Sequence, residues 1–272
     1  MIVSINEGGL SNRLKVIASC IRLDNKNYGV KWNILDDYKK NAHILNCPFN
    51  KLFKNNIEVD EIKKGDKVLK DPYLVIKESD NLPENFNNFK SNCNRGFRCQ
   101  DPKNRNIDYM YNKIPKFIKY EFINCFKKLE PIDELKKKIE DFSKNFKDTT
   151  ISVHIRSWNR NGEKSRRDGL FNIQKYEKEM KKYNLNYNFF ISTDSEEVRE
   201  YFLEKSELKK NIIFYNRVTS LNNSRDFIEG MQEDLIELYL LSKNKIIIGS
   251  HFSTFTEVAW YLACCPRTIT IL

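Results

Sequence analysis

The sequence lacks the cysteine patterns that mark metal-binding and disulfide-rich proteins. Its seven cysteines include no CxxC pair, which argues against a zinc site. Their number is odd and the chain is long, so a disulfide framework is not expected. Cys93 and Cys99 could pair in an oxidising compartment, but reduced thiols are the simpler expectation. We therefore predict neither a metal site nor a disulfide-stabilised scaffold.

Long apolar runs and repeats are absent as well. No window approaches the ~18 consecutive apolar residues that a transmembrane helix requires. The chain begins MIVSINEGGL, which has neither the charged nor the apolar region of a signal peptide. No internal repeat or long low-complexity tract occurs. These absences predict a soluble cytoplasmic protein without a membrane span.

The residues that are present indicate a packed protein with an anionic partner. Hydrophobic residues make up 40% of the chain and aromatic residues 12%, which is enough for a compact core. The formal net charge of +10 favours nucleic acid, a membrane surface or a phosphorylated small molecule as partner. Most lysines, such as those at 136–138 and 181–182, occur near glutamates in helix-like patterns typical of solvated helix faces. No basic helix, RRM or OB pattern supports nucleic-acid binding.

The hydrophobic pattern of the first half opens as an α/β unit. A β-branched run at 1–5, a glycine turn and a periodic segment at 13–23 together predict strand, turn and helix. A second strand is expected at 30–35, and an amphipathic connecting helix at 131–146. Residues 36–128 give only a mixed, loop-rich pattern, which is where we expect acceptor-binding loops.

The second half alternates strands and helices more clearly. Its β-α-β order implies a parallel sheet covered by helices on both faces. We place the domain boundary between 1–146 and 147–272. The predicted strands lie at 150–155, 187–192, 212–215, 245–248 and 268–272, and the predicted helices at 173–183, 195–205, 232–242 and 253–263.

Two polar segments follow predicted strands in places where an open parallel sheet binds ligands, outside the carboxyl ends of its strands. The first is the turn 7–13, where glycines admit a ligand close to the backbone and the following helix start offers N–H groups to an anion. Taken alone, it is only a turn. In the second, His154 and Arg156 share one side of a strand. Arg156 could fork onto phosphate oxygens, or it could be a structural arginine paired with an acid.

Two further strand ends complete the set. Asp194 follows a strand and precedes a helix, so it could accept hydrogen bonds from a base or ribose, or simply cap the helix. The segment 249–255 joins a buried strand to a helix through small hydroxyl residues. Ser253 and Thr254 with their neighbouring N–H groups could cradle a diphosphate, or again form a cap. His251 alone is more typical of a structural histidine.

The order of these segments, GGLSNR, VHIRSW, FFISTDS and DLIELYLLSKNKIIIGSHFSTF, resembles the GDP-fucose-dependent fucosyltransferases. That superfamily includes α1,2-, α1,6-, nodulation and protein O-fucosyltransferases. The resemblance covers roughly the first 25 residues and most of 150–272. It implies a GT-B-like fold of two Rossmann-like domains across a cleft, with the donor mainly in the C-terminal one. It further implies an inverting transfer of L-fucose from GDP-fucose to a glycan or protein hydroxyl, with no metal and no cofactor.

The resemblance also implies roles for individual residues. Arg156 would contact the β-phosphate and aid the departure of GDP, and His154 would line the donor site. We take Glu7 as the candidate general base, because some protein O-fucosyltransferases have an acid in this loop; the alternative is that no base is needed. The residues expected at the donor are Gly9, Asn12, His154, Arg156, Asp194, Ser253, Thr254 and Phe255.

The sequence departs from the family pattern at one motif. Many members carry two adjacent arginines where this chain has Arg156 and Ser157, and the later aspartate of that motif is missing. Whether an arginine at 160, 166 or 167 substitutes is open. These departures favour the protein O-fucosyl and α1,2-like branches over the α1,6 branch. The alternatives are a transferase for another nucleotide sugar and a non-catalytic sugar- or nucleotide-binding module.

Overall fold

The computed structural model describes residues 1–6, 8–32, 45–69, 116–157, 171–184, 186–251, 253–266 and 268–272. Within them lie two parallel sheets, one of three strands and one of five. The predicted α/β class is therefore confirmed. Among the described residues, no helix is both long and apolar enough to cross a bilayer. Cys93 and Cys99 lie outside the described residues.

The small sheet contains β1 (Ile2–Asn6), β2 (Tyr28–Trp32) and β3 (Lys67–Leu69) in the order β2-β1-β3. The strand expected at 30–35 thus begins two residues earlier, and positions 33–35 are not among the described residues. After β1, the glycine turn leads into α1 (Leu10–Leu23). This helix starts before the predicted residue 13 because Gly9 already occupies its N-cap position.

In the described part of the region that the sequence pattern made loop-rich, an α-helix was missed. It is α4 (Lys116–Lys127), and its buried residues Ile118, Phe122 and Phe126 recur at intervals of four. That spacing is a helical signal, but the surrounding Asn- and Lys-rich sequence diluted it. The next helix, α5 (Asp133–Ser143), lies inside the predicted 131–146.

The larger sheet has the order β6-β5-β4-β7-β8, and its elements match the predicted ones to within a few residues. The strands are β4 (Thr150–Ile155), β5 (Asn188–Thr193), β6 (Ile212–Ile213), β7 (Ile246–Gly249) and β8 (Thr268–Ile271). The helices are α7 (Ile173–Met180), α8 (Glu196–Glu200), α9 (Ile228–Leu241) and α10 (Thr254–Leu262). A π-helical turn, Tyr201–Lys205, continues α8, so the predicted helix 195–205 is almost entirely helical.

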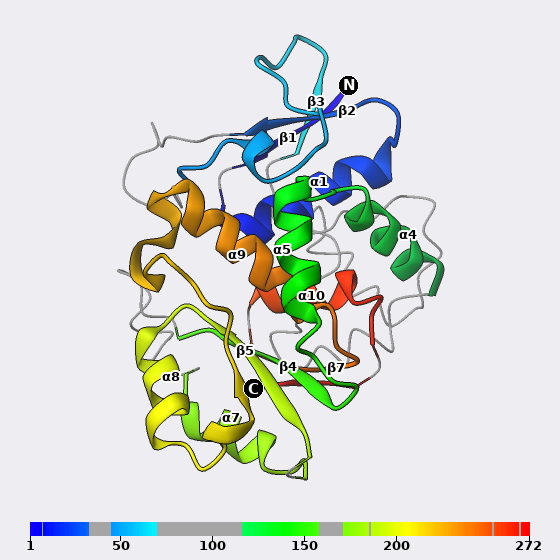
Figure 1. Ribbon diagram of the computed structural model, residues 1–272. Coiled ribbons are helices and arrows are strands. Elements are labelled where there is room, and N and C mark those ends of the chain that lie inside the picture. The colour runs from blue at the N-terminus through cyan, green and yellow to red at the C-terminus, as the bar shows by residue number, and fades with distance from the viewer. Residues whose placement is uncertain are drawn as a thin grey trace.

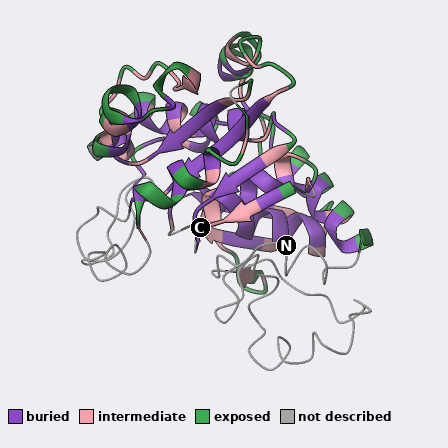
Figure 2. Ribbon diagram, turned by 90° about the horizontal axis from the view of Figure 1, so that it is seen from below, coloured by how far each residue is buried: buried purple, intermediate pink, exposed green. Residues whose placement is uncertain are grey.

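Helices cover both faces of this sheet, as the sequence predicted. Along β5, Phe189 and Ile191 belong to a hydrophobic cluster with α7 and α8, whereas Phe190 belongs to another cluster with α9 and α10. Alternation on a strand sends neighbouring side chains to opposite faces. Figure 2 shows the resulting layers: the strands are mostly buried, and the exposed residues lie mainly on the outer sides of the helices and on the connecting loops.

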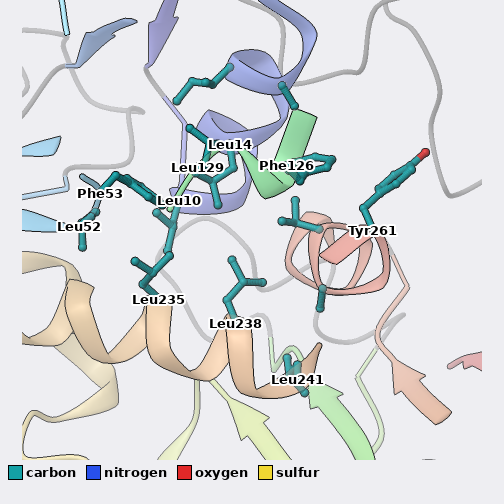
Figure 3. Packing of buried hydrophobic residues seen from close by; sticks show 14 of the residues in the cluster. Leu10, Leu14, Leu52, Phe53, Phe126, Leu129, Leu235, Leu238, Leu241 and Tyr261 are labelled. Atoms are coloured by element: carbon teal, nitrogen blue, oxygen red, sulfur yellow. The ribbon is translucent and has the colours of Figure 1, made fainter. Parts of the chain in front are cut away.

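The second of these clusters also reaches the small sheet. In Figure 1, α1, α9, α5 and α10 lie between the small sheet at the top and the larger sheet at the bottom. Leucines of α1 and α9 meet there beside Phe126 of α4 and Tyr261 of α10 (Figure 3). The rings of Phe126 and Tyr261 stack with centroids 5.4 Å apart. One core therefore joins residues from both sides of the predicted boundary at 146/147, and the boundary itself stays a prediction.

The end of α10 carries an unusual backbone that gives a stability prediction. Cys264 and Cys265 have φ values of 61° and 55°, and the Cys265 N–H donates to Trp260 O at 2.8 Å while the Cys264 N–H donates to Tyr261 O at 3.0 Å. This is the Schellman arrangement, whose left-handed residue is usually glycine.

Because Cys264 is exposed, replacing it with glycine removes strain and little packing. We expect Cys264→Gly to raise the free energy of unfolding by about 0.5–1 kcal/mol, measured by urea denaturation. The matched control is Ala263→Gly, where φ is −76° and glycine relieves nothing, so that variant should lose stability. Equal losses in both variants would contradict the prediction.

Candidate functional site

The site begins at the point where the larger sheet reverses its strand order, between β4 and β7. Ligands of open α/β sheets bind at such a point. Ser250, buried just after β7, ties the two strand ends together. Its Oγ accepts from the Arg156 N–H at 2.6 Å, donates to His154 O at 2.9 Å and lies 2.8 Å from Tyr176 Oη. The backbone that presents Arg156 is thereby fixed.

The Arg156 guanidinium forms an ion pair with Asp194 at the end of the neighbouring strand β5. The other carboxylate oxygen of Asp194 accepts from the Ser157 N–H at 2.7 Å. Both side chains keep some exposure, 13% for Arg156 and 18% for Asp194. Asp194 therefore orients Arg156 at the solvent boundary, and the two predicted site residues are adjacent.

The alternative interpretation of Asp194 as a helix cap is not what the structure shows. Ser195, not Asp194, occupies the N-cap position of α8, and the Ser195 side chain makes no capping hydrogen bond. The other alternative, a structural arginine paired with an acid, describes the contact correctly. The acid, however, is itself a predicted site residue at a strand end. The expected hydrogen bonds from a base or ribose to Asp194 stay a prediction.

His154 is held beneath this pair by the first turn of α10. Its Nδ1 lies 2.8 Å from Thr256 Oγ1, and its ring stacks on Phe255 with centroids 5.0 Å apart. Thr256 Oγ1 also accepts from the Ser250 N–H at 3.2 Å. A side chain at Gly249 would overlap Thr256, so glycine there lets α10 approach the sheet. Burial lowers the pKa of His154 to about 3, so its imidazole is neutral near pH 7.

This neutral histidine predicts a pH dependence of stability. The pKa of His154 in the folded chain lies below its ordinary value of ~6.5. The unfolded chain therefore binds the extra proton, and stability falls as the pH drops below 6.5. We expect the free energy of unfolding to fall by about 2 kcal/mol more in the wild type than in His154→Asn between pH 6.5 and 5. Parallel denaturation curves across that range would contradict this assignment.

The predicted diphosphate cradle also lies at the switch point. Ser253 is the N-cap residue of α10, is buried, and makes no side-chain capping hydrogen bond. Thr254 and Phe255 follow in the first turn, and both are half-buried. The cap interpretation of the Ser253 hydroxyl is therefore not realised. The positive end of the α10 dipole and these residues face the same strand ends as Arg156 and His154.

The glycine turn before α1 is a separate, well-anchored part of the site. Arg13 donates from Nε to Gly8 O at 2.7 Å, and its guanidinium lies over the buried Trp32 ring, 4.6 Å from the centroid. Asn12 packs on Gly8, since a Cβ there would lie 2.8 Å from Asn12 Cβ. Asn12 Oδ1 is buried and has no hydrogen-bond partner within the part of the chain that the structure describes. Glu7, the candidate base, lies outside the described residues, as do the arginines at 160, 166 and 167.

Two contacts that the sequence did not reveal join this turn to the strand ends. Lys15 of α1 and Glu257 of α10 form a buried ion pair of 2.5 Å, with exposures of 1% and 5%. The second contact involves a 3₁₀ turn, η5 (Leu221–Asp226). The Leu221 N–H donates to Glu196 Oε1 at 3.2 Å, and the guanidinium of Arg225 packs on Gly9. The four predicted segments are thus connected through α10 and η5.

A cluster of buried charges anchors α9 behind β5 and was also missed. Arg217, 4% exposed, has Asp234 at 2.9 Å, Glu237 at 3.4 Å and Glu233 at 3.5 Å. Glu237 accepts from Ser192 Oγ of β5 at 2.6 Å. Burial raises the pKa of Glu237, and the positive charge of Arg217 limits this rise. Among the described residues, no group of three or more His, Cys, Asp or Glu side chains is arranged to hold a metal ion.

The chain has two parallel sheets covered by helices, and polar strand ends and helix starts meet at the switch point of the larger sheet. This fold matches that of GT-B fucosyltransferases. The chain is similar to NodZ α-1,6-fucosyltransferase soaked with GDP-fucose, with a TM-score of 0.53 and 17% identity over 96% of this chain and 91% of that one. Fucosyltransferase NodZ from Bradyrhizobium gives the same TM-score and identity over 95% and 91%.

A plant enzyme shows the same likeness. An Arg-to-Lys variant of Arabidopsis thaliana FUT1 in complex with GDP has a TM-score of 0.54 and 12% identity, over 99% of this chain and 69% of that one. No known protein-family profile and no curated protein matches the sequence. At this level of identity, the likeness establishes the shared fold.

Proposed function

We propose that this protein is an inverting, metal-independent glycosyltransferase that transfers L-fucose from GDP-fucose to a hydroxyl of a glycan or protein acceptor. The observation that carries the proposal is the position of Arg156 at the switch point, where Ser250 holds its backbone N–H and Asp194 pairs with its guanidinium. The start of α10 follows the neighbouring strand β7. Residues 147–272 would bind the donor, and 1–146 would contribute the acceptor side.

In the proposed reaction, the bond between the anomeric carbon and the β-phosphate oxygen breaks, and that oxygen keeps the electron pair. A hydroxyl oxygen of the acceptor forms the new bond from the opposite face, so the configuration inverts. Negative charge grows on the departing GDP, where a fixed guanidinium and helix N-termini stabilise it most effectively. The hydroxyl proton leaves to Glu7, or to solvent if the departure of GDP drives the reaction.

The remaining predicted residues have supporting roles in this proposal. His154 is neutral and buried against Phe255, so it shapes the donor pocket as a hydrogen-bonding ring rather than as a charge. Ser253 and Thr254 would hold the diphosphate at the start of α10. Asn12 and Gly9 would face it from the start of α1.

The proposal is tested by a screen of nucleotides in the presence of EDTA, read by melting temperature. GDP should stabilise the protein, by about 2.7 kcal/mol at a hundredfold excess over its dissociation constant, and UDP should not. Transfer or hydrolysis of GDP-fucose is then measured directly. Stabilisation by UDP would indicate another nucleotide sugar. GDP binding without any turnover of GDP-fucose would indicate a non-catalytic module.

A further inference from the structure

Arg225 is positioned against the glycine turn by contacts on both sides of η5. Its carbonyl oxygen accepts from the Asn46 N–H at 2.8 Å, and the preceding Ser224 Oγ donates to Asp234 Oδ2 at 3.2 Å. A Cβ added at Gly9 would lie 3.1 Å from Arg225 Nη2 and 3.5 Å from its Cζ. The guanidinium itself, rather than the aliphatic stem, therefore packs on Gly9.

A second N–H-bearing side chain packs on the neighbouring glycine. A Cβ at Gly8 would lie 3.0 Å from Asn12 Nδ2, so Asn12 and Arg225 both lie against the same short turn. The first turn of α1 contains no acidic residue. Ser11 is 4% exposed, and neither its buried hydroxyl nor Asn12 Oδ1 has a hydrogen-bond partner among the described residues. The Gly8–Gly9 turn is thus bordered by N–H donors of Asn12 and Arg225 and by the positive end of α1.

We propose that Arg225 is a second cationic contact for the donor, binding a phosphate of the nucleoside diphosphate at the Gly8–Gly9 turn while Arg156 binds from the strand side. This inference rests on the proposed function. A diphosphate presents two charged groups, and a guanidinium pairs well with each because it donates in a planar fork. The start of α1 adds the positive end of a helix dipole beside Arg225.

The geometry also explains why glycine stands at position 9. Any side chain there would press on the guanidinium at 3.1 Å, a distance at which the arginine has to move by a few tenths of an ångström. η5 also spans from the Glu196 contact, two residues beyond Asp194, to the turn. The segment that carries Arg225 therefore contacts the start of α8 through Leu221 and the glycine turn through Arg225.

The test measures binding of GDP and GMP to the full chain by calorimetry at low salt with EDTA. The main variant is Arg225→Met, which keeps the stem and removes the charge. Its affinity for GDP should fall about 10- to 100-fold, with a smaller loss for GMP, which lacks the second phosphate. Arg225→Lys should lie in between. The matched control is Arg199→Met, whose guanidinium packs on Phe214 at 4.6 Å; its GDP affinity should stay within about twofold of wild type.

Gly9→Ser provides a second variant if Arg225→Met does not fold. It displaces the guanidinium without removing it, and it should also weaken GDP binding. Wild-type affinity for GDP in both Arg225→Met and Gly9→Ser would overturn the inference while leaving the proposed function intact. A wild-type protein that binds neither GDP nor GMP would overturn both.

Discussion

Replacing Arg156 with alanine should lower the rate of fucose transfer from GDP-fucose by about 10²- to 10³-fold, the usual cost of removing one fixed group that stabilises a developing negative charge. The loss should appear mainly in kcat, because the charge on the departing GDP is largest in the transition state. The measurement is steady-state transfer, with hydrolysis of GDP-fucose as a second readout.

Two further variants sharpen this experiment. Arg156→Lys keeps the charge but not the planar fork, so it should recover only part of the activity. Asp194→Asn keeps the shape of the side chain that orients Arg156 and removes its charge. It should leave the protein folded and impair turnover less than Arg156→Ala. Undiminished turnover in Arg156→Ala would rule out the role assigned to this residue.

Replacing Lys15 with methionine should lower the free energy of unfolding by about 3–5 kcal/mol, because it leaves the carboxylate of Glu257 buried without its partner. The penalty is increased by the second oxygen, Glu257 Oε1, which already has no hydrogen-bond partner among the residues that the structure describes. Chemical denaturation of the purified variant measures the effect.

The double variant Lys15→Met/Glu257→Leu tests whether the loss comes from the unpaired carboxylate. It replaces both charges with apolar groups of similar volume, so most of the lost stability should return. The control is Lys138→Met, which breaks the exposed pair of Lys138 with Glu134 and should cost at most about 0.5 kcal/mol. Equal losses from Lys15→Met and Lys138→Met would show that the buried pair contributes nothing special.

The larger sheet could be predicted well because its strands are short runs rich in β-branched and aromatic residues. β4 was located at its observed bounds, since Thr150–Ile155 is buried at every position and bounded by polar residues. The site followed from one general rule, that ligands bind beyond the carboxyl ends of parallel strands. Arg156 and Asp194 were found in this way on neighbouring strands, although their ion pair was not foreseen.

What could not be predicted depends on partners that are distant in the sequence. Lys15 and Glu257 are separated by 242 positions, and neither stands out in its own helix. Ser250 has its central role only because β4 and β7 are neighbours in the sheet. Arg225 belongs to a 3₁₀ turn with no periodic pattern, and only the folded chain brings its guanidinium to Gly9.

The hydrophobic cluster shared by α1, α4, α9 and α10 has a mechanical consequence. Segments joined by a large apolar interface do not swing freely against one another, whereas small polar interfaces permit such motion. On the proposed function, a nucleotide arriving at the switch point would therefore be accommodated by small side-chain movements around Arg156, which Asp194 already holds. In such a protein, binding energy would not be spent on closing a hinge between the two sheets.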